Sequence, residues 1–244
     1  MQNSEFNTGA IKPIECVQEA WELIKSDYWI LFAISIVGAL IGGVTFYVLI
    51  GAMVCGIFYC YLKKIDGGRV VFDDLWIGFK FFWPSLLVTL VMVVPMVVLM
   101  LIMFVTIYLP IITAAIMGER ANGTAILGTF VVGFVIDIVV ALIMICIHSL
   151  LIFAFPLIVD RNLSSWDAMK LSARAALKNI GGIGGMIVVN FVLAFLGELA
   201  FCVGLYLMIP IITAANLVAY RKVFPAVNRF NLDPPPPTAY QGLL

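Results

Sequence analysis

Three ionisable side chains stand inside long apolar stretches of this sequence. Of the 14 acidic residues only Asp137 and Glu198 do so, together with His148, the one histidine of the chain. An ionised group inside a bilayer costs about 2.5 to 3.5 kcal/mol on insertion scales, so each of these residues needs a reason to be there. A carboxylate that faces an imidazole could pass protons across a membrane, which makes Asp137 and His148 the candidates for chemistry.

Two interpretations of these groups stay open. If residues 125–159 fold back near Leu142, Asp137 and His148 lie about five residues from the apex on opposite arms and can form a proton relay. In the alternative, both groups, like Glu198, lie at the outer membrane interface, where water solvates them. Asn190, a fourth polar candidate, is expected to form a hydrogen bond with a neighbouring helix, as polar side chains do inside membranes.

The sequence offers little else for catalysis. It shows no Ser-His-Asp order, HExxH motif, paired catalytic carboxylates or cluster of metal ligands. The glycine-rich run at 181–185 follows no strand and is not interpreted as a phosphate loop. We therefore expect no enzyme, no cofactor and no metal. The five cysteines form no CxxC pair and are interpreted as packing residues: Cys16, Cys55, Cys60, Cys146 and Cys202.

Composition defines the elements that must carry these groups. Hydrophobic residues make up 64% of the 244 positions and charged residues 11%, against roughly half and about a quarter in soluble domains. A soluble fold could not bury that much apolar surface, so we predict an all-α polytopic integral membrane protein. The 14 basic residues balance the 14 acidic ones, and this zero net charge implies no nucleic-acid partner.

Four apolar stretches dominate the chain, at residues 28–62, 84–117, 125–159 and 180–220. A single helix of 35 residues would be about 52 Å long, well beyond the roughly 30 Å of hydrocarbon in a bilayer. Glycines near the middle of the first and last stretches, such as Gly43 and Gly197, allow a turn. The second stretch has no such residue near Leu101.

The basic residues favour hairpins over single spans, because cytoplasmic loops collect Lys and Arg. If every stretch is a hairpin, all 14 basic residues, Arg120 included, share one side, whereas single spans divide them 6 against 8. We therefore predict about eight transmembrane helices (range six to eight), arranged as hairpins with both termini cytoplasmic. Five tryptophans in or beside the cytoplasmic segments agree with this placement: Trp21, Trp29, Trp76, Trp83 and Trp166.

Short amphipathic segments precede three of the hairpins. Residues 13–27, 71–83 and 164–178 carry apolar side chains at helical spacing and are predicted to be helices lying in the membrane interface. Ser164 and Asp167 have the spacing of a capping box, so the third helix is predicted to begin near Ser164. The hexapeptide Pro-Ile-Ile-Thr-Ala-Ala occurs at 110–115 and again at 210–215, which predicts internal repeats.

Small residues at four-residue spacing allow helices to approach closely, either within one chain or between two. The predicted packing positions are Gly38 with Gly42, Ala52 with Gly56, and Gly181 with Gly185. Residues 1–230 are thus predicted to form a single helical membrane domain. Residues 231–244, with prolines from Pro234 to Pro237, are predicted to be an extended tail. The expected partners are the lipid bilayer and a protein or second copy bound through the small-residue faces or the tail.

Two segments of the chain resemble a known family. Residues 155–174 read Phe-Pro-Leu-Ile-Val-Asp-Arg-Asn-Leu-Ser-Ser-Trp-Asp-Ala-Met-Lys-Leu-Ser-Ala-Arg, and the last apolar stretch closes with Ile209, Pro210, Tyr220 and Arg221. Both are similar to a widespread group of prokaryotic polytopic membrane proteins, related to the membrane domain fused to some glycerophosphoryl diester phosphodiesterases. The resemblance covers about 153–223 and implies this architecture in a bacterial cytoplasmic (inner) membrane. It implies no chemistry, because the soluble phosphodiesterase domain does not occur among these residues.

Two function classes fit these observations. The first is a non-catalytic multi-pass membrane protein, a scaffold or an accessory subunit of a membrane assembly. The alternative is a transporter or channel for a small solute or lipid, which repeated hairpins and prolines inside apolar segments would favour. The first class is preferred because few polar groups are available to line a path. The prolines are Pro95, Pro110, Pro156 and Pro210.

Overall fold

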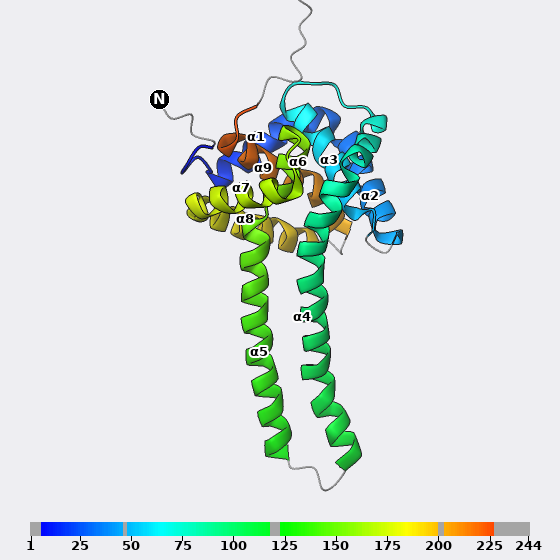
Figure 1. Cartoon of the computed structure of the whole chain (residues 1–244), viewed down its shortest axis with the longest axis vertical. Helices are drawn as coiled ribbons and strands as arrows, with labels where there is room; N and C mark the ends of the chain where they lie inside the picture. Colours follow the sequence, from blue (N-terminus) through cyan, green and yellow to red (C-terminus); the bar gives the residue numbers. More distant parts are fainter. Residues whose placement is uncertain (1–5, 46–47, 118–122, 200–202, 227–244) are drawn as a thin grey trace, which may run out of the picture.

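The chain folds into helices that form a packed body and a long two-helix arm (Figure 1). This computed structural model describes residues 6–45, 48–117, 123–199 and 203–226. Within those ranges helices are joined by turns and no strand occurs, which confirms the all-α prediction. The predicted tail at 231–244, Arg120 and Cys202 lie outside the described residues.

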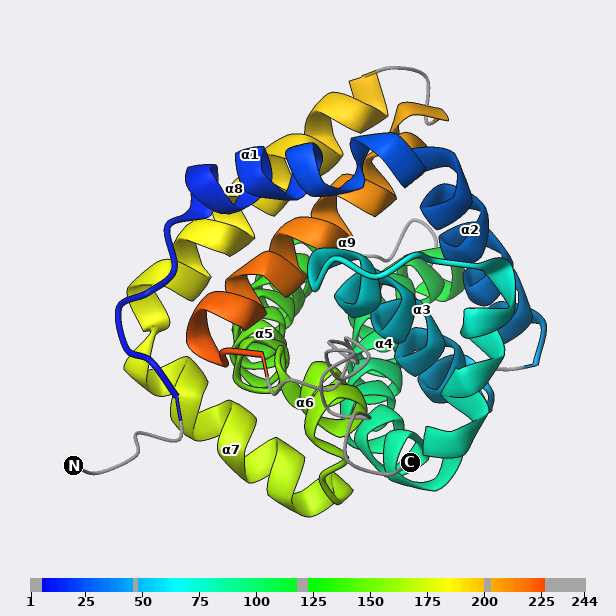
Figure 2. The ribbon, with the colours of Figure 1, turned by 90° about the horizontal axis from the view of Figure 1, so that it is seen from above.

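The body contains most of the helices. α9 (Val203–Val223) passes through its middle, packed against α1 (Pro13–Ile24) and α8 (Ile180–Leu199), which run alongside each other at one edge (Figure 2). Small residues such as Ala214 and Ala215 are fully buried on α9 and let its neighbours approach closely. The remaining body elements are η1 (Lys25–Asp27), α2 (Tyr28–Val44), α3 (Ile50–Ile65), η2 (Phe72–Phe81), α6 (Ala154–Arg161) and α7 (Ser165–Lys178).

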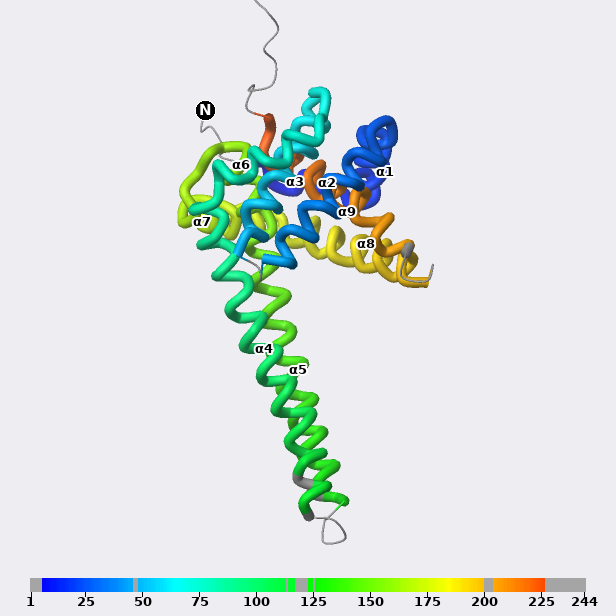
Figure 3. The backbone as a smooth tube through the Cα atoms, turned by 90° about the vertical axis from the view of Figure 1, so that its right-hand side faces the viewer, coloured from blue at the N-terminus to red at the C-terminus, as the bar shows by residue number. Residues whose placement is uncertain are grey.

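The arm consists of α4 (Phe82–Met117) and α5 (Gly123–Leu150), which run side by side away from the body (Figures 1 and 3). α4 has 36 residues and α5 has 28, so they are about 54 Å and about 42 Å long. Pro95 and Pro110 lie inside α4 without ending it, as membrane helices allow when the freed backbone groups are satisfied locally.

Two of the four predicted hairpins are wrong. Residues 84–117 form one helix because nothing between Phe82 and Met117 is a glycine, asparagine or aspartate that could make a turn. Residues 125–159 do not fold back at Leu142, which lies inside α5; the helix continues to Leu150, and α6 follows after a short turn. A fold-back inside either helix would have left backbone groups unpaired in an apolar environment.

These corrections change the membrane topology. The described residues hold five helical segments long and apolar enough to cross a membrane: Pro13–Val44, Phe72–Ile116, Ile126–Arg161, Ile180–Leu199 and Gly204–Val223. The prediction of about eight spans is not confirmed. The C-terminal end of α4 and the N-terminal end of α5 lie at the far tip of the arm (Figure 1).

The direction of the helices also differs among the five segments. In Figures 1 and 3, α8 runs across the direction of the arm. Membrane-spanning helices tilt by about 20° on average from the bilayer normal. The arm and α8 therefore cannot both stand upright in one membrane.

The other two apolar stretches each contain a pair of helices. α2 and α3 lie within the first stretch, with α3 continuing to Ile65, and α8 and α9 lie within the last, with α9 continuing to Val223. The three segments predicted to lie in the interface are helical as well, with η2 wound as a 3₁₀ helix. α7 begins as predicted, since the Ser164 hydroxyl accepts a hydrogen bond from the Asp167 amide at 3.3 Å. That these helices lie in a membrane interface stays a prediction.

The two copies of the hexapeptide occupy different surroundings. Pro110 is followed by exposed Ile111 and Ile112 near the tip of the arm. In α9 the matching residues lead to the fully buried Ala214 and Ala215 in the centre of the body. The predicted internal repeat is therefore not confirmed.

Candidate functional site

The most strongly connected polar group of the body is a charged cluster where α3, α6 and α9 end. The Arg221 guanidinium donates to both carboxylate oxygens of Asp160, at 2.7 and 2.9 Å, and to both oxygens of Asp66, at 2.9 and 2.6 Å. The Tyr220 hydroxyl donates to Asp160 Oδ2 at 2.7 Å. We name Asp66, Asp160, Tyr220 and Arg221 the Arg221 cluster.

The side chains of this cluster are largely shielded from solvent. The side chains of Asp160 and Arg221 are 2% and 9% exposed, and that of Asp66 is 12% exposed. Two bidentate pairs satisfy nearly all donors of one guanidinium in the planar geometry that arginine provides. Breaking such a pair leaves a buried charge uncompensated, which is much more costly than losing a surface ion pair.

Local structure brings the two aspartates to Arg221. α6 stops at Asn162, whose left-handed φ of 51° suits a helix C-cap and places Asp160 in the last turn. α3 ends at Ile65 and is capped by Asp66, and Gly67 follows with a φ of 85°, a conformation that glycine adopts without strain. The chain reversal after α3 thus directs Asp66 toward α9.

Sequence reasoning missed this cluster because it considered ionisable residues only inside the apolar stretches and counted Arg221 among the basic residues that lie on the cytoplasmic side. One signal was available: Asp160 and the pair Tyr220 and Arg221 both stand in the segments that carry the family resemblance. Further ion pairs involve residues in the last turns of α3 and α9. Lys63 pairs with Asp74 at 2.9 Å, Lys222 with Glu19 at 2.9 Å, and Lys64 with Asp27.

Asp137 lies in the seam between the two helices of the arm. Its carboxylate accepts a hydrogen bond from the Thr106 hydroxyl of α4, at 2.9 and 3.2 Å from the two oxygens. One turn earlier in α5, Gly133 is buried, and a Cβ placed there would lie 2.9 Å from Cβ of Thr106. Close approach at Gly133 therefore sets Thr106 against Asp137.

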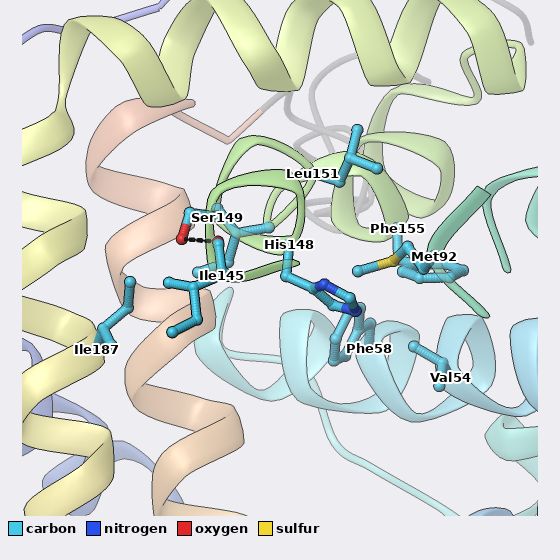
Figure 4. A pocket seen from close by; sticks show the side chains of 10 residues that line it. Val54, Phe58, Met92, Ile145, His148, Ser149, Leu151, Phe155 and Ile187 are labelled. Atoms are coloured by element: carbon cyan, nitrogen blue, oxygen red, sulfur yellow. Dashed lines mark hydrogen bonds between the residues drawn. The ribbon is translucent and has the colours of Figure 1, made fainter. Parts of the chain in front are cut away.

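His148 lies near the body end of α5 and lines an open hollow of about 490 Å³. Its Nδ1 is 2.9 Å from the Met144 carbonyl oxygen, one turn earlier in the helix. Around the ring the hollow is apolar, with Phe58, Met92 and Phe155 nearby (Figure 4). It could hold an apolar group, such as part of a lipid chain.

The proton relay between Asp137 and His148 is wrong in this fold. Both residues belong to the continuous helix α5, so they lie about 16 Å apart along its axis and not on facing arms. Asp137 stands midway between Gly123 and Leu150, and its placement at an outer interface stays a prediction. Glu198 is exposed near the end of α8, a position compatible with that alternative.

Asn190 forms the interhelical contact expected of it. Its Nδ2 donates to Oδ1 of Asn216 at 2.9 Å and links α8 to α9. Its own Oδ1 is buried without a hydrogen-bond partner. Asn190 thus joins α8 to α9 through its amide nitrogen.

The predicted glycine positions differ in what they contact. A Cβ at Gly38 would lie 2.8 Å from Ile57, and one at Gly42 would lie 3.1 Å from the Ile50 Cα, so both permit close packing of α2 on α3. A Cβ at Gly185 would lie 2.6 Å from Pro13. Gly181 has open space around it and is not a packing position, because it lies on the exposed side of α8.

The closest packing joins α3 to η2, where the sequence predicted packing positions on α3 alone. A Cβ on Gly56 of α3 would lie 2.1 Å from the Leu75 carbonyl oxygen, and one on Gly78 of η2 would lie 2.1 Å from the Ala52 carbonyl oxygen. Gly78 was not among the predicted positions, because its partner lies on another element. The two glycines let η2 lie directly on α3.

The described residues bring together no group of three or more metal-ligating side chains. Cys16, Cys55 and Cys60 are buried free thiols, and Cys146 is exposed on α5. The chain matches no protein-family model, no curated protein and no solved structure.

Proposed function

We propose that this protein is a non-catalytic membrane protein that serves as a scaffold or accessory subunit of a membrane assembly, with the arm as its contact surface. The observation that supports this most directly is the exposure of the arm. Of the 18 most apolar consecutive residues in each of its two helical segments, only 11% are buried. The corresponding share in Gly204–Val223 of α9 is 44%. Away from the body, α4 and α5 pack on each other and leave their other faces uncovered (Figure 3).

The membrane placement is part of the same proposal. The arm crosses a bacterial cytoplasmic membrane, and the body lies at the cytoplasmic face with both chain termini. Two features support this orientation: the lysine-rich and arginine-rich ends of the body helices, and five exposed tryptophans in α1, η2, α7 and the first turns of α2 and α4. We also propose that the chain is related to the prokaryotic membrane-protein group that residues 155–174 resemble.

The test is native mass measurement after gentle extraction of the full-length protein into lipid nanodiscs. A stoichiometric second protein is the expected result. The double substitution Val131→Trp and Val135→Trp enlarges an exposed face of α5 and should release that protein. The matched control is Val188→Trp and Val192→Trp, on an exposed face of α8, which should retain it.

A different outcome would favour the second function class. A lone protomer or a homo-oligomer with bound lipid, and no second protein, would contradict the scaffold and support transport or binding of a lipid or small solute. The specific observation behind that alternative is the apolar hollow beside His148. In that case Val54→Phe, which fills the hollow from α3, should reduce the amount of co-purifying lipid.

A further inference from the structure

Asp137 is an ionisable group inside the long apolar helix α5. It lies midway along α5, about 20 Å from either end of the helix. A carboxylate can accept about four hydrogen bonds. Among the described residues its hydrogen-bond partner is Thr106 alone.

Thr106 cannot satisfy that carboxylate by itself. Its hydroxyl carries one proton, and the Met103 carbonyl oxygen, at 3.1 Å, competes with Asp137 for it. No lysine or arginine occurs in the sequence of α4 or of α5, and His148 lies about 16 Å further along the axis. Neither α4 nor α5 therefore offers a lysine or arginine to pair with the Asp137 carboxyl group.

Asp137 is also accessible from outside the arm. Its side chain is half-buried at the edge of the seam, and the flanking Ile136 and Ile138 are 43% and 45% exposed. A neighbouring helix that packs along this edge would reach the carboxylate. Ionised groups within membranes generally pair with one another or with backbone carbonyls.

From these observations we propose that the arm binds a transmembrane helix of another protein that carries a lysine or arginine at mid-membrane depth, paired with Asp137. This inference rests on the proposed function and names the chemistry of the partner. Lipid cannot provide the cation, because headgroup amines lie roughly 15 Å from the bilayer centre, half the thickness of the hydrocarbon. A second copy cannot provide it either, because its arm would present the same carboxylate and again no cation.

A designed probe tests the pairing with the full-length protein in lipid vesicles. The probe is a leucine-alanine transmembrane helix with a single lysine at its centre, and its association is followed by fluorescence energy transfer. The comparison probe has leucine at that position. The lysine probe should associate about 3- to 30-fold more tightly, the range that interhelical polar contacts in membranes produce.

Variants of Asp137 distinguish the loss of its charge from a loss of the folded structure. Asp137→Asn should abolish the preference for the lysine probe, while Asp137→Glu should retain it. Glu198→Gln removes a carboxylate from an apolar stretch of α8 and should leave the preference unchanged. The leucine probe should bind all four proteins equally, which would show that the arm remains folded.

Three outcomes would overturn the inference. One is equal binding of the two probes to the wild-type protein, and another is a preference that survives Asp137→Asn. The third is energy transfer between labelled copies of this chain that Asp137→Asn abolishes, which would indicate self-association. If the native assembly keeps a second protein while Asp137→Asn has no effect, the scaffold function stands and this pairing alone fails.

Discussion

The Arg221 guanidinium holds Asp160 through two hydrogen bonds of 2.7 and 2.9 Å and so fastens the end of α9 to α6. The same group holds Asp66 at the end of α3. Arg221→Met should therefore leave the buried carboxylate of Asp160 and the partly buried carboxylate of Asp66 uncompensated, and lower the free energy of unfolding by about 3 to 5 kcal/mol. Thermal unfolding in detergent measures this change.

A matched control for that change is Lys170→Met, which removes an exposed partner of Asp167, 2.9 Å away. Exposed pairs contribute about 0 to 1 kcal/mol, so little effect is expected. Arg221→Lys should give an intermediate loss, because an ammonium group cannot form two bidentate pairs. Equal small effects of Arg221→Met and Lys170→Met would contradict the structural role of the Arg221 cluster.

Gly56→Ala should destabilise the protein because the new methyl group would meet the Leu75 backbone carbonyl at 2.1 Å, and η2 would have to move off α3. Overpacking of this kind costs about 1 to 3 kcal/mol. Gly181→Ala, also within a helix but in open space, should be neutral or stabilise by up to about 1 kcal/mol. Circular dichroism on heating compares the two, and a reversed order would show that these contacts are not formed.

Asn190 and Asn216 can be tested by a double-mutant cycle. Replacing either residue with leucine should cost about 0.6 to 1.7 kcal/mol, because its partner in the neighbouring helix loses the 2.9 Å hydrogen bond. The double variant should be close to wild type, since both polar groups are then gone. Additive losses in unfolding free energy would mean that the two amides do not interact.

Cysteine labelling can test the membrane topology of the arm. In a cysteine-free background, Ile116→Cys and Gly123→Cys at the tip of the arm should react with an impermeant thiol reagent from the same side of the membrane. Asp73→Cys in η2 should react from the opposite side, because a helix of about 54 Å exceeds the roughly 30 Å of hydrocarbon. Labelling of all three from one side would restore the hairpin prediction for residues 84–117.

The cap of α7 has a defined pH dependence. Hydrogen bonds from the Ser164 hydroxyl, and then from Lys170, hold the pKa of Asp167 below its ordinary value of 3.8. A lowered pKa means that the carboxylate stabilises the folded state above that ordinary value and loses this effect as the pH falls through its folded pKa. Ser164→Ala should therefore raise the pKa of Asp167.

Carbon-13 NMR of the Asp167 carboxyl group follows this titration directly. The control is Ser165→Ala, whose hydroxyl donates to the Pro84 carbonyl oxygen and should leave the Asp167 pKa unchanged. An unshifted titration in Ser164→Ala would exclude the capping interaction as the cause.

Sequence alone determined the features that depend on local composition and spacing. Apolar stretches with no lysine or arginine and at most one acidic residue had to become helices that could span a membrane. The spacing of Ser164 and Asp167 placed the start of α7. The same reasoning singled out Asp137 and Asn190, because polar groups in apolar surroundings are visible without a structure. It also anticipated Gly38 and Gly42 as packing positions.

Only the tertiary structure decided which helices continue and which residues meet. The bias of basic residues favoured four hairpins. However, α4 contains no glycine, asparagine or aspartate for a turn, and backbone hydrogen bonding kept it and α5 continuous. That continuity separated His148 from Asp137 and brought Thr106 to it instead. The pairing of Arg221 with Asp66 and Asp160 joins residues at least 61 positions apart, and sequence spacing carries no information about contacts that arise when three helix ends converge.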